Sequence, residues 1–443
     1  MTSLPANSIT KRFSAKVYQA VWRWHFWAGL LISPVLVIVS ITGALYVFKP
    51  ELERVMYPEI MLNEGISHVH AGFDTFANRV EERDPTHKLH FINVSKDPAR
   101  NWEGFAEVSG PNGTRGLLRY YYNPRNRKIA GTLDNETSFF RVVLAIHRRL
   151  MGGTPGRIIV EVAVSWTIIT VLTGAYLWWP RKKGKVRGVW IPRNKGSVRS
   201  LLRDWHAIPA IYLSIFIVAI MVTGLLFTKV WGTAFRASVF LSGGFPEFFI
   251  SPPKSVVEEG AEMPADSDAI SIDQAVATGF NHFDFHKAGF GLDLPHSGSN
   301  DAFSITTDTK EPFSDRAAIF IDRFSGETLA FATNDDLPWQ TKAVLLFYPI
   351  HVGSIFGLAT KVLAVISCLL LIAMSVTGVW MWWKRKPIGT IGAPRKTPAK
   401  TIPAWIAWFA VALAVFLPLV GLTLIFLFLI DWTAKKISKP LVV

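Results

Sequence analysis

Long apolar runs alternate with polar segments along the whole chain. Each run reaches the roughly 20 residues that an α-helix needs to cross about 30 Å of hydrocarbon. The runs cover residues 25–48, 157–179, 207–230, 360–383 and 404–430. The pattern predicts an α-helical integral membrane protein. The first run lacks a small-residue cleavage site, so we expect it to stay in the protein as a signal anchor.

Charge indicates how these runs are oriented. The formal net charge is +14, and Lys and Arg gather in the N-terminal segment, after the second run and after the fourth. Short basic loops stay in the cytoplasm. We therefore predict a multi-pass membrane protein with a cytoplasmic N-terminus, whose segments at 49–146 and 231–346 are periplasmic or extracellular. The excess of positive charge fits this topology and contact with the lipid bilayer, and we expect no nucleic-acid partner.

The last run fits this topology poorly. A fifth crossing puts the C-terminus outside, although the tail carries Lys435, Lys436 and Lys439. The alternative is a break at Pro418 and a last segment that does not cross fully. We favour five crossings. The single Cys368 lies within a span, so no disulfide framework, Cys-rich metal site or covalently attached c-type haem is expected.

The order of apolar and polar segments predicts two copies of one structural unit. Each unit is a span, an outer segment and a second span, and a final helix follows the two units. Because both units begin and end on the same side, the repeats are parallel, and their pseudo-two-fold axis should follow the membrane normal through a four-helix core. The expected segments are the N-terminus with the first span (1–48), two small periplasmic α/β domains (49–146 and 231–346), an interfacial helix with a span in each unit (147–180 and 347–383), two basic cytoplasmic loops (181–203 and 384–402), the third span (204–230), and the fifth span with the tail (403–443).

Alternating apolar residues predict strands in both outer segments. The expected elements are strands at 87–95, 102–109, 119–130, 303–307 and 317–332, and a helix at 272–278. A hairpin is expected after Asn123 in the first segment and after Asp322 in the second, because Asn or Asp followed by a polar or Gly-containing turn is typical hairpin chemistry.

Four histidines occupy matched places in the two units. His25 and His206 begin the first and third spans, and Gly43 and Gly224 follow them at the same distance of 18 residues. That distance is about 27 Å along a helix. The two glycines should therefore lie at the opposite membrane face from their own histidines.

The other two spans repeat this arrangement. His147 and His351 precede the second and fourth spans, and Gly174 and Gly378 lie near the cytoplasmic ends of those spans. Equivalent residues face each other across a two-fold axis, so His25 should pair with His206, and His147 with His351. The glycines should then lie at the depth of the opposite pair, where a residue without Cβ lets a flat macrocycle approach the backbone or lets helices pack closely.

Paired imidazoles are good axial ligands for haem iron, and two of them favour electron transfer over oxygen binding. We therefore predict two b-type haems, one held by His25 and His206 near the cytoplasm and one by His147 and His351 near the periplasm. Taken singly, each histidine is more typical of an ordinary headgroup-level residue. It is the repetition in two-fold register that favours ligation.

Several of these residues resemble a known family. The resemblance lies in His147-Arg148-Arg149, Gly156-Arg157, the end of the second span at Trp178-Trp179-Pro180-Arg181, and the hairpin at Ile321-Asp322 with Gly326-Glu327. The sequence over about residues 15–390 is similar to the PepSY-associated transmembrane family of bacterial inner-membrane proteins. The second unit departs from this pattern, with Val352-Gly353 after its histidine and Thr360-Lys361 in place of Gly-Arg.

The resemblance implies PepSY-like outer domains and similarity to di-haem ferric-siderophore reductases. We accordingly expect an oxidoreductase that passes electrons to a periplasmic ferric siderophore or other ferric chelate and releases ferrous iron. No nucleotide-binding motif is present, so the donor would be a separate cytoplasmic flavin or NAD(P)H reductase, or a membrane quinol. Two other classes stay open: a permease for iron or siderophore, for which Glu161 is the main intramembrane acidic residue, and a haem-free binding or regulatory protein.

Overall fold

The computed structural model describes residues 6–63, 72–109, 115–180, 186–257, 262–308, 315–386, 392, 394 and 404–437. It divides into two compact units. The first comprises residues 1–47, 144–237 and 350–443, and the second comprises residues 48–143 and 238–349. Each outer segment of the sequence thus contributes to the second unit, and the apolar runs contribute to the first.

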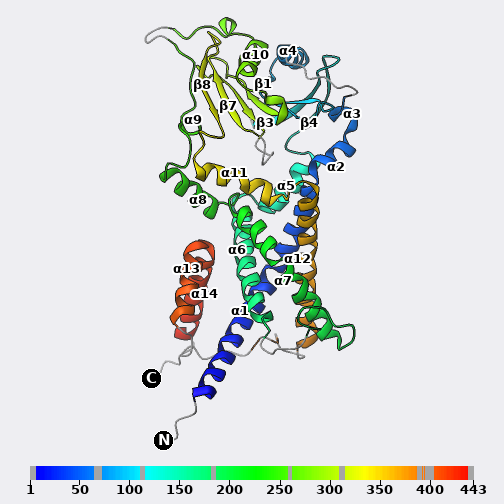
Figure 1. Ribbon diagram of the computed structural model, residues 1–443, viewed down its shortest axis with the longest axis vertical. Helices are drawn as coiled ribbons and strands as arrows, with labels where there is room; N and C mark the ends of the chain where they lie inside the picture. Colours follow the sequence, from blue (N-terminus) through cyan, green and yellow to red (C-terminus); the bar gives the residue numbers. More distant parts are fainter. Residues whose placement is uncertain are drawn as a thin grey trace. The chain divides into compact units, whose positions relative to one another are not determined.

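The first unit is built on four helices long and apolar enough to cross a membrane, among the residues described (Figure 1). They are α1 (Ala6–Val47), α6 (Gly153–Trp178), α7 (Val198–Leu225) and α12 (Leu358–Arg385). Helix α1 packs against α6 and α12, and α7 packs against the same two helices. Among these four helices, each helix of one half of the chain therefore packs against the same two neighbours as its counterpart in the other half.

Shorter helices join these spans to the second unit. They are α2 (Lys49–Met56), α3 (Pro58–Met61), α5 (Phe139–Arg149), α8 (Val230–Leu241), α9 (Glu247–Ile250) and α11 (Trp339–His351). His147 lies near the end of α5, and His351 ends α11.

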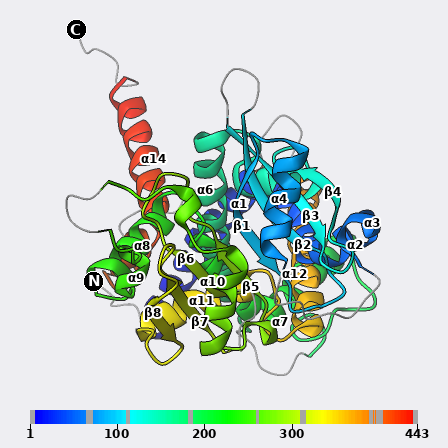
Figure 2. The same cartoon turned by 90° about the horizontal axis from the view of Figure 1, so that it is seen from above.

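The second unit contains one antiparallel sheet of eight strands in the order β4-β3-β2-β1-β5-β6-β7-β8. The strands are β1 (Lys88–Val94), β2 (Trp102–Ser109), β3 (Arg115–Asn123), β4 (Lys128–Asp134), β5 (Phe290–Asp293), β6 (Phe303–Thr307), β7 (Ala317–Ile321) and β8 (Thr328–Thr333). Each outer segment supplies one helix and four consecutive strands. The helices are α4 (Phe73–Arg83) and α10 (Ile272–His282), and Figure 2 shows both over the same face of the sheet.

The two separate outer domains that the sequence suggested are therefore a wrong expectation. Strand β1 pairs with β5 in an antiparallel ladder from Phe91–Asp293 to Val94–Phe290. Phe73 of α4 and Val276 of α10 belong to one core of buried residues. An isolated half would leave β1 or β5 as an unpaired edge with exposed N–H and C=O groups, and pairing the two edges satisfies them.

The two covering helices also cap one another. The Asp273 carboxylate accepts hydrogen bonds of 2.8 Å from the backbone N–H groups of Gly72 and Phe73 at the start of α4. In return, the Asp74 carboxylate accepts from the N–H groups of Ile272 and Asp273, at 2.8 and 3.0 Å. A carboxylate near a helix N-terminus satisfies free donors and complements the helix dipole. This exchange joins the two halves of the sheet unit.

The strand predictions differ in accuracy. The expected strands at 102–109 and 303–307 are confirmed as β2 and β6, and both hairpins form where Asn123 and Asp322 begin the turn. Strand β5 was not predicted, because its short FGLD sequence carries almost no alternation. Helix α4 was also missed, although its apolar residues Phe73, Phe76 and Val80 have helical spacing.

The last apolar run is broken. Helix α13 (Ala404–Phe416) ends before Leu417, and α14 (Pro418–Ile437) begins with the proline. A Cβ on Gly421 would lie 3.3 Å from the Cβ of Ala414, seven residues earlier. Residues seven apart in a straight helix are separated by about 10 Å, so the chain turns back sharply at this point.

Contacts with the bundle give the direction of α14. The Trp231 indole donates to the carbonyl oxygen of Phe416 (2.9 Å), and its backbone N–H donates to Glu161 (2.7 Å). Further along, the Trp166 indole donates to the hydroxyl of Thr423 (3.1 Å). Helix α14 therefore runs beside α6 in the same direction as α6. The expected fifth crossing is not confirmed, and the structure has the break that Pro418 suggested.

Candidate functional site: two histidine pairs in the helix bundle

The four histidines lie in two pairs within the first unit. The ring centroids of His25 and His206 are 6.3 Å apart, and those of His147 and His351 are 6.2 Å apart. These are the partners expected from the repeat. We call His25 and His206 the inner pair, and His147 and His351 the outer pair.

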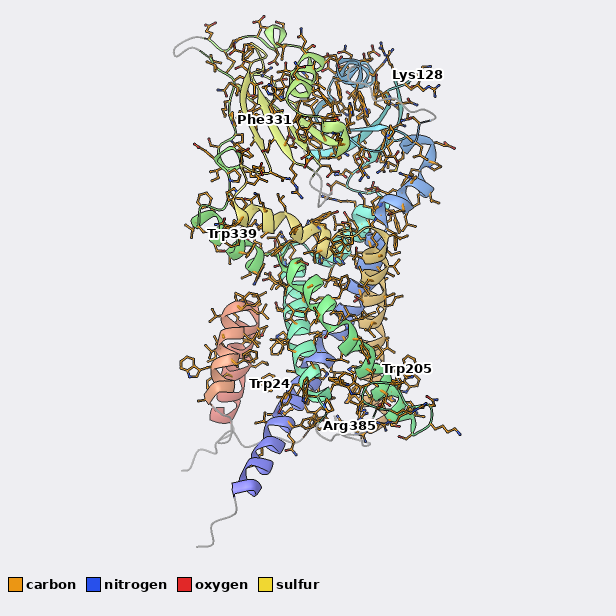
Figure 3. The ribbon with its side chains drawn as sticks, viewed as in Figure 1. Trp24, Lys128, Trp205, Phe331, Trp339 and Arg385 are labelled. Carbon is orange, nitrogen blue, oxygen red and sulfur yellow. The ribbon has the colours of Figure 1, made fainter. Side chains whose placement is uncertain are left out.

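Tryptophans flank the inner pair. Trp24 and Trp205 immediately precede the two histidines, and Figure 3 shows them with Arg385 at one end of the bundle. The Trp24 ring stacks on Trp166 of α6, with centroids 6.1 Å apart and planes 10° apart. Trp205 is 60% exposed, as expected for a membrane-interface residue.

Each histidine lies against a glycine of another helix. The contacts join His25 to Gly174 on α6, His147 to Gly43 on α1, His206 to Gly378 on α12, and His351 to Gly224 on α7. For the first three histidines the preceding threonine contacts the ring as well.

The hydrogen bonds of three rings follow one rule. Nδ1 bonds the backbone carbonyl of the residue four positions before the contacting glycine. The partners are Thr170 for His25 (3.0 Å), Val39 for His147 (3.0 Å) and Ile220 for His351 (2.9 Å). Nδ1 of His206 bonds the Thr377 hydroxyl (3.2 Å). A carbonyl only accepts, so Nδ1 must carry the proton and Nε2 keeps its lone pair. An Nδ1–H bond to a carbonyl is the usual way to orient a metal-ligating histidine.

The threonines support the same tautomer. Thr42, Thr173 and Thr377 lie within 3.1–3.2 Å of the Nδ1 atoms of His147, His25 and His206. Each hydroxyl donates its own proton to the carbonyl four residues earlier in its helix. The hydroxyl oxygen is then left to accept from Nδ1–H. All four rings, with or without this second acceptor, offer Nε2 as the free nitrogen.

The glycines make room for the imidazoles. A Cβ on Gly224 would lie 2.6 Å from Cε1 of His351, and the corresponding distances are 3.1 Å for Gly43, 3.2 Å for Gly174 and 3.5 Å for Gly378. The expected depths of the glycines agree with these contacts. In the structure a histidine ring lies beside each of these glycines. A contact between glycine and a macrocycle stays a prediction.

The separation of the rings suits a metal between them. A metal–imidazole bond is about 2 Å, and a ring nitrogen lies about 1.1 Å from the ring centroid. Two such bonds in line put the centroids about 6 Å apart. The observed 6.3 and 6.2 Å agree with this value. Within the described residues no cluster of three or more His, Cys, Asp and Glu side chains is placed to hold a metal ion.

Other candidate side chains have different roles. Glu161 is buried, and its carboxylate accepts from the backbone N–H groups of Val230 and Trp231 at the start of α8. It therefore caps a helix, which removes the main acidic residue that suggested a permease. His282 bonds the hydroxyl of Thr328 (3.2 Å). His68 and His70, which have a chelating spacing, lie outside the described residues.

Sequence inspection missed the acceptors of the histidines. The Thr-Gly repeats were visible, but the backbone carbonyls four residues before each glycine have no signature in the residue types. The hydrogen bond between Trp166 and Thr423 was missed as well, because the two residues lie 257 positions apart in the chain.

Comparison with known proteins agrees with the family resemblance. No curated protein matches the chain. The family model described as the PepSY-associated TM region matches residues 22–385, which include both histidine pairs and both halves of the sheet unit. The chain belongs to this family of membrane proteins.

Proposed function

We propose that the protein is a transmembrane electron conduit in which each histidine pair binds the iron of one b-type haem. The observation that carries the proposal is the matched geometry of the two pairs, 6.3 and 6.2 Å between ring centroids, with Nδ1 of every ring hydrogen bonded. Haem supplies one-electron chemistry when it is bound. The protein supplies the ligands, fixes their tautomer and excludes water.

The positions of the pairs support conduction across a membrane. Gly43 of α1 contacts His147 of the outer pair, and His25 lies 18 residues earlier in the same helix. That length of helix is about 27 Å, close to the thickness of the hydrocarbon core. The two pairs therefore serve opposite faces of the bundle.

We assign the inner pair to the cytoplasmic side of the bacterial inner membrane. The supporting observation is the Lys and Arg content of the segments next to His25 and His206. Electrons would come from a cytoplasmic flavin or NAD(P)H reductase or from a membrane quinol. The acceptor is a ferric chelate, with a siderophore as the best candidate from the family resemblance. Each ferric ion takes one electron, and the ferrous ion is held less firmly by hard oxygen ligands.

The deciding experiment is an absorption spectrum of the full chain purified in detergent, oxidised and reduced with dithionite, with haem counted per chain. Two low-spin b-type haems are expected. A colourless protein from cells supplied with haem would refute the proposal and favour a haem-free binding protein. One haem would mean that one histidine pair has another role.

Two variants then test the assignment of the pairs. His206→Ala should lose the inner haem and keep the outer one. His147→Ala should stop reduction of ferric chelates while the inner haem stays reducible from the donor side. Loss of both haems in the His206 variant would mean that the two sites are not independent.

A further inference from the structure

Two arginines converge on one backbone oxygen beside the outer pair. After α7 ends, the chain turns through Leu226, Phe227 and Thr228 into α8. The carbonyl oxygen of Phe227 accepts from the guanidinium groups of Arg148 (3.3 Å) and Arg157 (3.1 Å). A carboxylate would be a stronger acceptor for either guanidinium than this neutral carbonyl, because charge-assisted hydrogen bonds are about twice as strong.

Both arginines belong to the surroundings of the outer pair. Arg148 directly follows His147, and the Phe227 ring lies 5.7 Å from the ring of His351. Arg148 therefore places a positive charge one residue from one outer ligand, and the residue whose carbonyl it shares with Arg157 contacts the other ligand.

Only the first half of the chain carries guanidinium groups at these two positions. The residue after His351 is Val352, and the position matched to Arg157 holds Lys361. Helix packing alone gives no reason for guanidinium groups on only one side of a two-fold arrangement. A ligand that carries its negative charges on one edge does give a reason, because only that edge needs cationic partners.

We propose that Arg148 and Arg157 form an anion-binding site for the propionate carboxylates of the haem at the outer pair. The inference rests on the proposed function and adds to it which residues hold the acidic edge of that haem. Each guanidinium offers five N–H donors in a planar fork that matches a carboxylate. The Phe227 carbonyl then marks the place where the two forks meet.

The arginines have a second chemical effect at this site. Positive charge close to a redox centre favours the reduced form, since reduction removes one unit of positive charge from the iron. Loss of either arginine should therefore lower the midpoint potential of the outer haem and leave the inner haem unchanged.

The test uses full-length protein in detergent, stripped of haem and titrated with haem or with haem dimethyl ester, whose carboxylates are blocked. Arg157→Gln and Arg148→Gln should each weaken binding of haem at the outer pair by about tenfold or more and leave binding of the ester unchanged. Arg157→Lys should recover part of the affinity. In redox titrations of the haem-loaded Arg148→Gln and Arg157→Gln variants, the midpoint potential of the outer haem should be lower than in the wild type, and that of the inner haem should be unchanged.

Arg236→Gln is the matched control. Arg236 donates to the carbonyl oxygen of Leu226 (2.8 Å), the neighbouring residue of the same turn. If this variant loses as much haem as Arg157→Gln, the arginines only stabilise the turn, and the inference is wrong. It is also wrong if Arg157→Gln binds haem normally but binds ferric citrate more weakly, because the site then serves an anionic acceptor. A wild-type chain that takes up no haem would instead contradict the proposed function.

Discussion

Substituting alanine at two of the four glycines offers a sharp test of the histidine sites. Gly224 and Gly378 both lie inside long helices, and both face a histidine ring. A Cβ on Gly224 would approach Cε1 of His351 to 2.6 Å, whereas a Cβ on Gly378 would lie 3.5 Å from Cε1 of His206. Ordinary contacts begin near 3.4 Å. His351 must therefore move by about 0.8 Å in Gly224→Ala, and His206 need not move in Gly378→Ala.

A shift of this size is large for a ligand. Binding geometry has to be kept within about 0.5 Å, and disturbing the groups that orient a ligating histidine typically costs 10- to 100-fold in metal affinity. The Nδ1–H bond from His351 to Ile220 (2.9 Å) opposes the movement as well. We therefore expect Gly224→Ala to lose most of its outer haem. A tenfold loss of haem affinity corresponds to about 1.4 kcal/mol. Gly378→Ala should keep both haems and gain up to about 1 kcal/mol of helix stability.

Haem per chain, the low-spin spectrum and the thermal midpoint of the purified variants measure this contrast. Both variants add the same methyl group to a transmembrane helix, so they control for each other. Equal haem content in the two variants, whether high or low, would refute the argument that the missing Cβ of Gly224 is what admits the imidazole.

Three further outcomes are expected. Because α14 turns back beside α6, a reporter fused to the C-terminus should lie on the same side of the membrane as the N-terminus. A reporter on the opposite side would restore the fifth crossing. Asp74→Asn and Asp273→Asn should each destabilise the sheet unit by about 1 kcal/mol, with a double variant that is not additive; additive losses in thermal unfolding would mean that the two caps act separately. Glu161→Gln should lower the thermal midpoint by weakening the α8 cap and leave haem content unchanged, and a colour change would instead place Glu161 in the electron path.

The sequence was sufficient where the signal is periodic and local. Membrane helices must satisfy their backbone groups internally, so length and hydropathy alone located four of the spans. The bounds of α6 and α12 agree with the expected runs within a few residues, whereas α1 and α7 begin well before theirs. The hairpins after Asn123 and Asp322 were readable because a turn needs particular side chains at fixed places. The histidine pairs could be predicted because the four histidines occupy matched positions in the two halves of the sequence.

Other features depend on which surfaces meet in space. Nothing in Phe290–Asp293 or in Lys88–Val94 indicates that these strands pair, because an antiparallel ladder uses backbone groups that every residue has. The same reason hid the carbonyl acceptors of the histidines. From the sequence, Pro418 allowed either a continuous fifth span or a break. The contacts of Trp231 with Phe416 and of Trp166 with Thr423 show the break.

The sequence by itself determined the membrane class and the matched spacing of the four histidines and their glycines. The tertiary structure alone decided that the outer segments share one sheet, that each of these glycines faces an imidazole of another helix, and that two arginines meet at Phe227. The physical reason is the range of the forces involved. Hydrophobic periodicity is set by each residue's own neighbours along the chain, whereas hydrogen bonds and close contacts are set by atoms that only folding brings within 3–4 Å.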